Sequence, residues 1–383
     1  MLYYSLFYNF FVDFKLLFTT ILKIYFFIIA LMWIVFWFGI FLVCSCMFLY
    51  DLWRITKIFN FDVKLCILLW ISLLLAMLSF FTIWYQWENK ILTILWTFAS
   101  RIFVLSFLLL WLFLLEHIIS IWYKVNKRIV TAVILIILCI WFFFALHTKI
   151  THLDIQTDKI EKDLKILMVS DIHVDYVMSK IHLNKIKDYI QNEKPDLVLI
   201  VWDLLNRPHS WYLKYYEMFN DEIKVPIYAV MWNHDVMWNT SIIQDVSNIS
   251  SIKLLNNWVT ETNWIRLVSI IDKSIWRQYS VDDIIAQTNF DNDDSKFTIF
   301  MTHQPINLEK LKNYNIDLEL AWHTHRGQIL WFRQLVYFMN DYWYWRYDQD
   351  WKIAFVSQWL WVWWLPFRFW TQSEMVEINL KKK

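Results

Sequence analysis

Glycine is almost absent from this chain, in which 2 of 383 residues are glycine and 27 are tryptophan. Glycine reaches positive φ without a steric clash, so tight turns and close approaches of the backbone normally use it. Average usage of about 7% gives roughly 27 glycines in a chain of this length. A large α/β protein with two glycines is therefore hard to build.

The chain also has no excess of charge of either sign, and most of it lacks cysteine. Lys and Arg total 36 against 35 Asp and Glu, so the net charge of +1 gives no reason to expect a nucleic-acid partner. The four cysteines, Cys44, Cys46, Cys66 and Cys139, all lie before residue 150. The remainder has neither disulfides nor a thiolate metal site, so a metal there needs His, Asp, Glu or Asn ligands.

Long apolar runs dominate the first 150 residues and raise the hydrophobic content of the chain to 58%. A helix needs about 20 apolar residues to cross a bilayer, and helices of soluble proteins are seldom apolar on all sides for that length. The sequence predicts a transmembrane helical region over 1–150 and a second domain over 151–383. The predicted spans lie near 24–49, 64–86, 92–121 and 129–147.

Basic residues in the connections between these spans predict their orientation, because cytoplasmic loops are enriched in Lys and Arg. Six basic residues flank the first and third connections, and four lie on the other side. This favours cytoplasmic connections one and three, with the domain after residue 150 extracytoplasmic. The six are Arg54, Lys57, Lys64, Lys124, Lys127 and Arg128, and the four are Lys15, Lys23, Lys90 and Lys149.

From about residue 163 the pattern changes to short, apolar, β-rich runs. Polar segments with apolar residues at helical spacing, 178–194 and 211–223, separate the first three runs. This strand–helix–strand rhythm predicts an α/β domain with a largely buried sheet. The predicted strands are 164–170, 196–201, 226–231, 297–302 and 317–321.

Side chains that bind metals follow each of the five predicted strands. Open α/β sheets place their sites at the carboxyl ends of their strands. One Asp-x-His group alone is more often structural, but five groups in register indicate a single metal centre. In strand order the groups are Asp171 and His173, then Asp203, then Asn233, His234 and Asp235, then His303, and last His323 and His325.

These motifs, read in order as DIH, WD, WNHD, a lone His and WHTH, resemble those of the calcineurin-like metallophosphoesterases. That family has D-x-H, GD, GNHD, His and GHTH followed by GQ. The similarity extends over 163–378, and the apolar N-terminal region resembles the membrane-bound bacterial branch of the family. The resemblance implies a four-layer αββα metallophosphoesterase sandwich behind a multi-span transmembrane region.

The resemblance also implies two divalent metal ions and their ligands. Carboxylate, imidazole and carboxamide ligands suit Mn, Fe or Zn. Two such ions about 3.5–4 Å apart generate a bridging hydroxide near neutral pH and clamp the phosphoryl oxygens. By resemblance, Asp171, His173 and His325 hold the first ion, Asn233, His303 and His323 hold the second, and Asp203 bridges the two.

Two residues beside the ligands have catalytic roles by resemblance. His234 faces the scissile phosphate, where it stabilises negative charge or protonates the leaving oxygen. Asp235 either orients that imidazole or caps a helix.

Some positions depart from the family pattern. Arg326 replaces a family glycine and either binds a substrate phosphate or is a solvated loop residue. Asn206 and Asp175 also differ from many relatives, although neither position is a metal ligand. His182 and His209 match no motif and are expected at the surface.

Tryptophan stands where the family has glycine, at Trp202, Trp232 and Trp322. Two turns lead to the same conclusion without the family, because Asn263–Trp264 and Asp350–Trp351 would become N-G and D-G between β-like runs, the strongest short hairpin signals. The segment 357–370, SQWLWVWWLPFRFW, would likewise become a glycine-rich loop. We infer that most tryptophans are glycine in the organism, through UGA codons read as glycine. The alternative is a degenerate, genuinely tryptophan-rich protein.

The sequence thus predicts a membrane-anchored phosphoesterase, a hydrolase of EC class 3.1 that cleaves a phosphomonoester or phosphodiester. Anchoring suggests membrane lipid as a partner and a lipid-linked substrate. The alternative is a catalytically inactive membrane protein whose soluble domain binds a ligand or partner. A transporter is disfavoured, because Arg101 is the one charge deep within an apolar run.

Overall fold

The structure is a computed structural model of the chain, and it describes most residues from 126 onward and scattered positions before that. By its contacts, the chain divides into two units, Met1–Ala132 and Val133–Lys383. The described residues are 50, 53, 57, 109, 112–113, 115–120, 123, 126–170, 172, 174, 179–201, 210–220, 223–230, 240–255, 257–270, 280–321, 337–338, 341–358, 360, 368 and 371–383.

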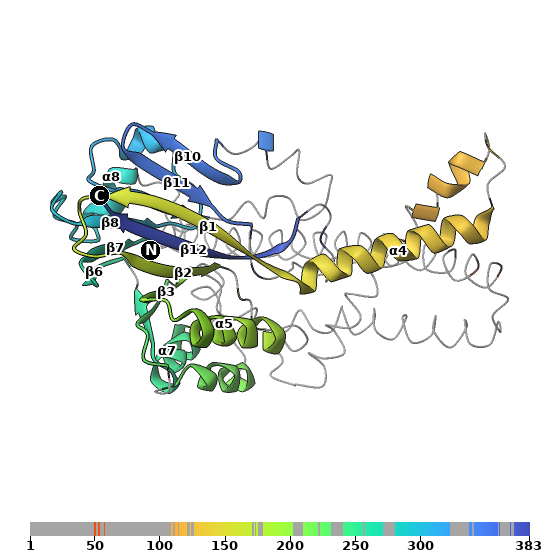
Figure 1. Cartoon of the computed structure of the whole chain (residues 1–383), viewed down its shortest axis with the longest axis horizontal. Helices are drawn as coiled ribbons and strands as arrows, with labels where there is room; N and C mark the ends of the chain where they lie inside the picture. Colours follow the sequence, from red (N-terminus) through yellow and green to blue (C-terminus); the bar gives the residue numbers. More distant parts are fainter. Residues whose placement is uncertain are drawn as a thin grey trace, which may run out of the picture. The chain divides into compact units, whose positions relative to one another are not determined.

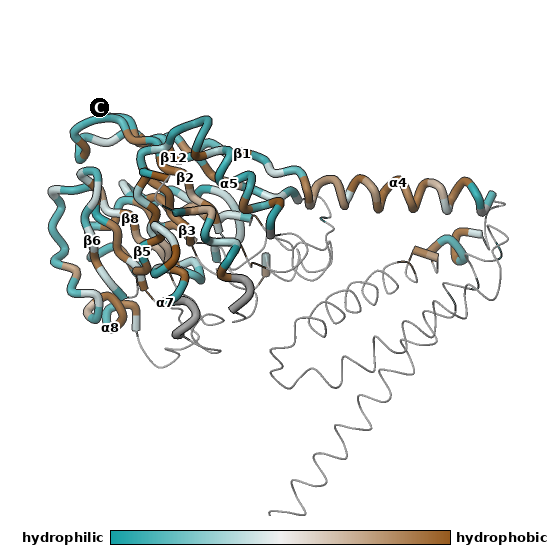
Figure 2. Tube along the Cα trace, turned by 90° about the horizontal axis from the view of Figure 1, so that it is seen from below, coloured by the Kyte–Doolittle hydropathy of each residue, from teal (hydrophilic) through white to brown (hydrophobic). Residues whose placement is uncertain are grey.

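One long apolar helix, α4 (Lys127–Leu146), precedes the sheets. Its 19 residues Arg128–Leu146 form the one helix among the described residues that is long and apolar enough to cross a membrane. Figure 2 shows hydrophobic residues along most of its length. It coincides with the predicted span 129–147. The predicted spans 24–49 and 64–86, and most of 92–121, lie outside the described residues.

Strands of the described residues form two six-stranded sheets (Figure 1). All five predicted strands are present, which confirms the α/β class. The first sheet has the order β1 (Thr148–Thr157), β12 (Ser373–Lys382), β2 (Leu164–Ser170), β3 (Leu197–Val201), β4 (Ile227–Val230), β5 (Ile252–Leu255). The second has the order β10 (Trp345–Gln349), β11 (Lys352–Val356), β9 (Leu318–Ala321), β8 (Phe297–Met301), β7 (Ile265–Ser269), β6 (Trp258–Thr262).

The two sheets face each other across a shared apolar core. Alternate residues of each strand point to opposite faces, so Ile166 and Met168 of β2 meet residues such as Leu267 and Met301 of the second sheet. Burying one such side chain stabilises the fold by about 1.5–3 kcal/mol. Central strands are covered on both faces, and every residue of β3 is buried.

Helices cover the two outer faces, so the layers run helix, sheet, sheet, helix. The outer face of the first sheet packs against Leu183, Tyr216 and Val246 of three such helices. The outer face of the second sheet packs against Ile284 and Leu308. The helices on the first sheet are α5 (Ser179–Glu193), the 3-10 helix η1 (Ser210–Phe219) and α7 (Thr240–Ile249), and those on the second are α8 (Val281–Ala286) and the 3-10 helix η2 (Leu308–Leu311).

The two predicted hairpins are present, and three of their four turn residues have left-handed backbones; Trp351, the expected glycine of the second turn, does not. β6 pairs with β7, and the two turn residues Asn263 and Trp264 have φ of 46° and 65°. β10 pairs with β11 through a turn in which Asp350 has φ of 54°. Trp345 at the start of β10 has φ of 78°. A bulky residue at positive φ is strained, whereas glycine is not.

The expected surface position of His182 is wrong. His182 lies on α5 and is fully buried, at 0% exposure. Burial lowers the pKa of His182 to about 3, with smaller contributions from the charges of Lys185 and Arg368. The histidine is therefore neutral near pH 7, and its position between α5 and the sheet could not be inferred from a motif. His209 lies outside the described residues.

Replacing Trp264 with glycine should stabilise the protein, because the left-handed backbone costs a residue with a Cβ roughly 1–2 kcal/mol. The cation–π contact that would be lost, Lys162 Nζ at 5.0 Å from the ring centroid, contributes about 0.5–1 kcal/mol at an exposed site. We expect Trp264→Gly to raise the free energy of unfolding by about 0.5–1 kcal/mol, measured by denaturant unfolding in detergent.

The matched control is Trp258→Gly, at an exposed position in β6 whose backbone is not left-handed. Glycine within a strand costs about 0.5–1 kcal/mol, so this variant should be less stable. Destabilisation by Trp264→Gly as large as that by Trp258→Gly would contradict the strain at position 264.

Candidate active site

The carboxyl ends of β2, β3 and β4 are aligned at one edge of the first sheet. The three strands run parallel, with Ser170 beside Val201 and Val201 beside Val230. In the sequence, Asp171 directly follows Ser170, and Asp203 is two residues beyond Val201. The strand ends therefore bring the starts of three motif segments to the same edge.

The second sheet has the same arrangement at β8, β9 and β11. These strands are also parallel, with Met301 beside Leu320 and Ala321 beside Val356. The Thr302 N–H donates to the Leu320 carbonyl at 3.0 Å, so the pairing continues to the residue before His303. His323 lies two residues beyond the end of β9.

Hydrogen bonds join the carboxyl ends of the two sheets to each other. The hydroxyls of Ser170, the last residue of β2, and Ser357, the residue after β11, lie 3.4 Å apart. The Leu360 N–H also donates to the Ser170 carbonyl at 3.2 Å. All five predicted motifs thus follow strand ends that meet at one edge of the sandwich, which we call the carboxyl edge.

A buried carboxylate, Glu374 at the start of β12, organises this junction. It accepts hydrogen bonds from the Thr151 hydroxyl at 2.5 Å, the Gln358 N–H at 3.1 Å and the Ser357 hydroxyl at 3.4 Å. A buried carboxylate is costly unless it is hydrogen-bonded. Because its donors come from β1 and from the segment after β11, Glu374 ties both sheets together beside Ser170.

A second buried carboxyl, Glu319 on β9, supports the segment that carries His303. The Thr302 hydroxyl donates to Glu319 Oε1 at 3.0 Å, and the Ile306 N–H donates to the same oxygen at 2.7 Å. Glu319 is fully buried, and this burial raises its pKa to about 8. Its two donors lie on either side of His303, so the carboxyl sets the path of that turn.

One predicted metal ligand, His303, lies within the described residues, and its side chain is 2% exposed. The described part of the chain contains no cluster of three or more His, Cys, Asp or Glu that could hold a metal. The other predicted ligands lie outside this part of the chain, and their mutual arrangement stays a prediction. The site residues outside the described part are Asp171, His173, Asp203, Asn233, His234, Asp235, His323 and His325, and so are Arg326, Asn206 and Asp175.

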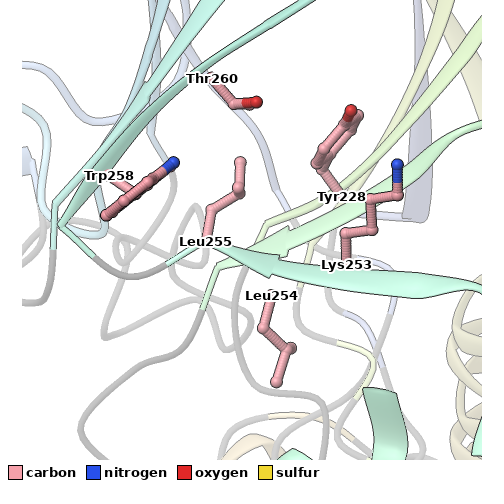
Figure 3. A pocket seen from close by; sticks show the side chains of 6 residues that line it. All are labelled: Tyr228, Lys253, Leu254, Leu255, Trp258 and Thr260. Carbon is pink, nitrogen blue, oxygen red and sulfur yellow. The ribbon is translucent and has the colours of Figure 1, made fainter. Parts of the chain in front are cut away.

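A hollow of about 460 Å³ lies between the edge strands β5 and β6 (Figure 3). Figure 3 shows Lys253 and Leu255 on one side of β5 and Leu254 on the other. Lys253 Nζ is 5.5 Å from the centroid of the Tyr228 ring. The six lining residues include no His, Asp or Glu, so they supply none of the expected ligands.

Sequence reasoning missed the two buried glutamates. An acidic residue inside a run such as DLELA (317–321) is a signal for a buried carboxyl, because strands covered on both faces are otherwise apolar. Glu374 gave no comparable local signal, since its donors lie as far away in the sequence as Thr151.

Glu319 predicts a fall in stability as the pH rises. The carboxyl ionises near pH 4.5 when unfolded, and its pKa is raised to about 8 when folded. The stabilisation from the neutral form is present below pH 4.5 and is lost as the pH rises through 8. Glu319→Gln keeps an acceptor oxygen for Thr302 and Ile306 but cannot ionise.

We therefore expect the free energy of unfolding to fall by about 4 kcal/mol more in the wild type than in Glu319→Gln between pH 5 and 8.5. The measurement is denaturant unfolding in detergent with chelator. Equal slopes against pH for the two proteins would contradict the raised pKa.

Part of the chain matches one family model, and two relatives of similar sequence carry a related description. Residues 164–327 match the family described as Calcineurin-like phosphoesterase, and this range begins at the first residue of β2 and contains all seven predicted metal ligands. A protein of Helicobacter pylori described as an uncharacterized metallophosphoesterase is 27% identical over 238 residues, which cover 61% of this chain and 64% of that one. The chain thus spans just under two thirds of that relative.

A second relative and one solved structure extend the comparison. A Campylobacter jejuni protein, also described as an uncharacterized metallophosphoesterase, is 26% identical over 270 residues, covering 68% of this chain and 72% of that one. The solved structure of GAP50, described as the anchor in the inner membrane complex of Plasmodium, is 13% identical with a TM-score of 0.33, covering 51% of this chain and 71% of that one. A TM-score of that size supports no functional inference.

Proposed function

We propose that this protein is a metal-dependent phosphoesterase of the calcineurin-like metallophosphoesterase family. The match to the family model and the two relatives support this proposal. The observation that carries the proposal is the carboxyl edge. Strand ends from both sheets meet there, and each of five is followed in the sequence by a side chain that binds metals. Ligand types from separate strands are what a dinuclear site requires.

The residues at this edge fit two hard divalent cations. The available donors are carboxylate, imidazole and carboxamide, and no cysteine occurs after Cys139, which suits Mn, Fe or Zn. We propose one ion on Asp171, His173 and His325 and another on Asn233, His303 and His323, with Asp203 between them. When bound, the two cations would supply positive charge to the phosphoryl oxygens and lower the pKa of water.

The proposed roles of the remaining residues follow from their positions beside these ligands. His234 would hold a proton at an imidazole nitrogen facing the scissile phosphate and would donate it to the leaving oxygen. Such general acid catalysis contributes typically 10²–10⁴-fold. Asp235 would either orient that imidazole or cap a helix.

We further propose that residues 1–150 anchor the enzyme as a multi-pass transmembrane region and that 151–383 form an extracytoplasmic catalytic domain. The support is the apolar helix α4 and the apolar runs before it in the sequence. Membrane lipid would then surround the anchor, and the substrate would be a lipid-linked phosphate ester.

The backbone conformation of two tryptophans supports the proposed reading of UGA as glycine. Trp264 and Trp345 have φ of 65° and 78°, the region that favours glycine. The two residues are 40% and 41% exposed, so neither indole is fully buried. Peptide sequencing of the protein from its own organism tests the proposal, and tryptophan at positions 202, 232 and 322 would refute it.

The assigned roles predict different defects in two histidine variants. His303→Ala removes a metal ligand, so it should lose bound metal and on the order of 100-fold or more in kcat/KM. His234→Ala should keep the metal content and lose about 10²–10⁴-fold in kcat. The measurements are metal analysis and hydrolysis of bis(4-nitrophenyl) phosphate with Mn, Zn or Mg, using full-length protein with glycine at the UGA codons.

The control is His152→Ala, which should keep full activity. The imidazole of His152 is 59% exposed and pairs with Glu377 on the neighbouring strand β12. Chelator should abolish hydrolysis by every variant. The alternative of an inactive binding domain predicts no metal-dependent hydrolysis at all. Full activity of His234→Ala would remove its role, and full metal content and activity in His303→Ala would remove the proposed ligand set.

A further inference from the structure

The apolar helix α4 joins the domain at the carboxyl edge. β1 begins at Thr148, two residues after α4 ends, and Thr148 pairs with Ser373 at the start of β12 (Figure 1). β12 runs antiparallel to β2, with Val376 beside Met168, so the start of β12 lies at the carboxyl end of β2. The helix therefore enters at the same edge as the proposed ligands, and not at the opposite, amino edge.

Hydrogen bonds hold the last turns of α4 against this edge. Carbonyls of the last turn of a helix need partners from outside it. The Ser373 hydroxyl donates to the Ala145 carbonyl at 2.7 Å, and the Lys185 ammonium donates to the Leu146 carbonyl. The Arg368 N–H donates to the Trp141 carbonyl at 3.1 Å.

Arg368 connects this joint to the Glu374 junction, because its guanidinium donates to the Gln358 carbonyl at 3.0 Å. Trp141 lies five residues before the end of the helix, or about 7–8 Å along its axis. The apolar remainder of α4 thus begins within one or two turns of the carboxyl edge, and its residues Val133, Ile136 and Ile140 are exposed.

Basic residues lie near the joint. The exposed Lys149 and Lys180 and the half-buried Lys185 belong to the segments 139–150 and 179–187, and the buried Glu374 is the register partner of Lys149. At the amino edge Lys159 is paired with Asp317 at 2.8 Å. A basic residue near an anionic bilayer contributes about 1 kcal/mol of attraction.

From the strand register, the bonded helix end and this charge, we infer that the carboxyl edge faces the bilayer surface and that the substrate is the phosphate-ester headgroup of a membrane lipid. The inference rests on the proposed function. Hydrolysis would break the bond between phosphorus and one ester oxygen. The oxygen and one proton of water go to the phosphoryl product, and the other proton goes to the released alcohol. The lipid would reach the site by lateral diffusion.

The orientation is tested without activity by two cysteine variants of the full-length protein in phosphatidylcholine–phosphatidylglycerol vesicles. The four native cysteines are replaced by serine, and a fluorophore is attached at Lys180→Cys or at Lys162→Cys. Both lysines are exposed, and β2, which spans about 23 Å, separates the two edges on which they lie. We expect lipids with nitroxide headgroups to quench the probe at 180 several-fold more than the probe at 162. Equal quenching, or stronger quenching at 162, would overturn the orientation.

The substrate class is tested with two 4-nitrophenyl phosphodiesters in the same vesicles, one with a hexadecyl chain and one with a methyl group in its place. We expect kcat/KM to be at least about tenfold higher for the hexadecyl ester, since a site facing the bilayer reaches the embedded phosphate. Equal or faster hydrolysis of the methyl ester would overturn the inference and leave the proposed phosphoesterase intact. No metal-dependent hydrolysis of either ester would overturn both.

Discussion

The junction of the two sheets at their carboxyl edge is the constraint on which the rest of this protein depends. Parallel pairing aligns the strand ends within each sheet. It does not bring the carboxyl ends of the strands in one sheet close to those in the other sheet. The contacts of Ser170, Ser357 and Leu360 do so, with Glu374 buried beside them and hydrogen-bonded to Thr151. A buried carboxylate without those donors would cost several kcal/mol. Separating the donors from Glu374 is therefore unfavourable, and this keeps the two sheets joined.

Much of the fold could be predicted from the sequence, because the signals for many strands lie within short stretches of it. Strands covered on both faces read as apolar runs, as in 164–170 and 197–201, and polar groups after them mark their ends. β1 and β12 were missed because they pair only with distant segments, Thr148 with Ser373 for example. The burial of His182 and Glu319 was equally out of reach of motif reasoning, since it depends on tertiary packing. The ligand set was predicted from motifs alone.

The tryptophans show a conflict between local sequence and global fold. Natural sequences usually agree with their structure at both levels, yet Trp264 and Trp345 have a backbone that suits glycine, and both residues are partly exposed. The proposed glycine at positions 264 and 345 would remove the conflict. The same proposed change of coding at positions 202, 232 and 322 would restore the glycines of the family motifs.

The end of α4 and the Glu374 junction lie on the side of the domain where the strands before the proposed ligands end. The central claim is that this edge assembles a pair of cations, and electron paramagnetic resonance of the metal-stripped, full-length protein titrated with Mn²⁺ tests it most directly. The account predicts two ions per chain and the multi-line spectrum of a spin-coupled pair. One ion or fewer per chain, with an uncoupled six-line spectrum, would contradict it.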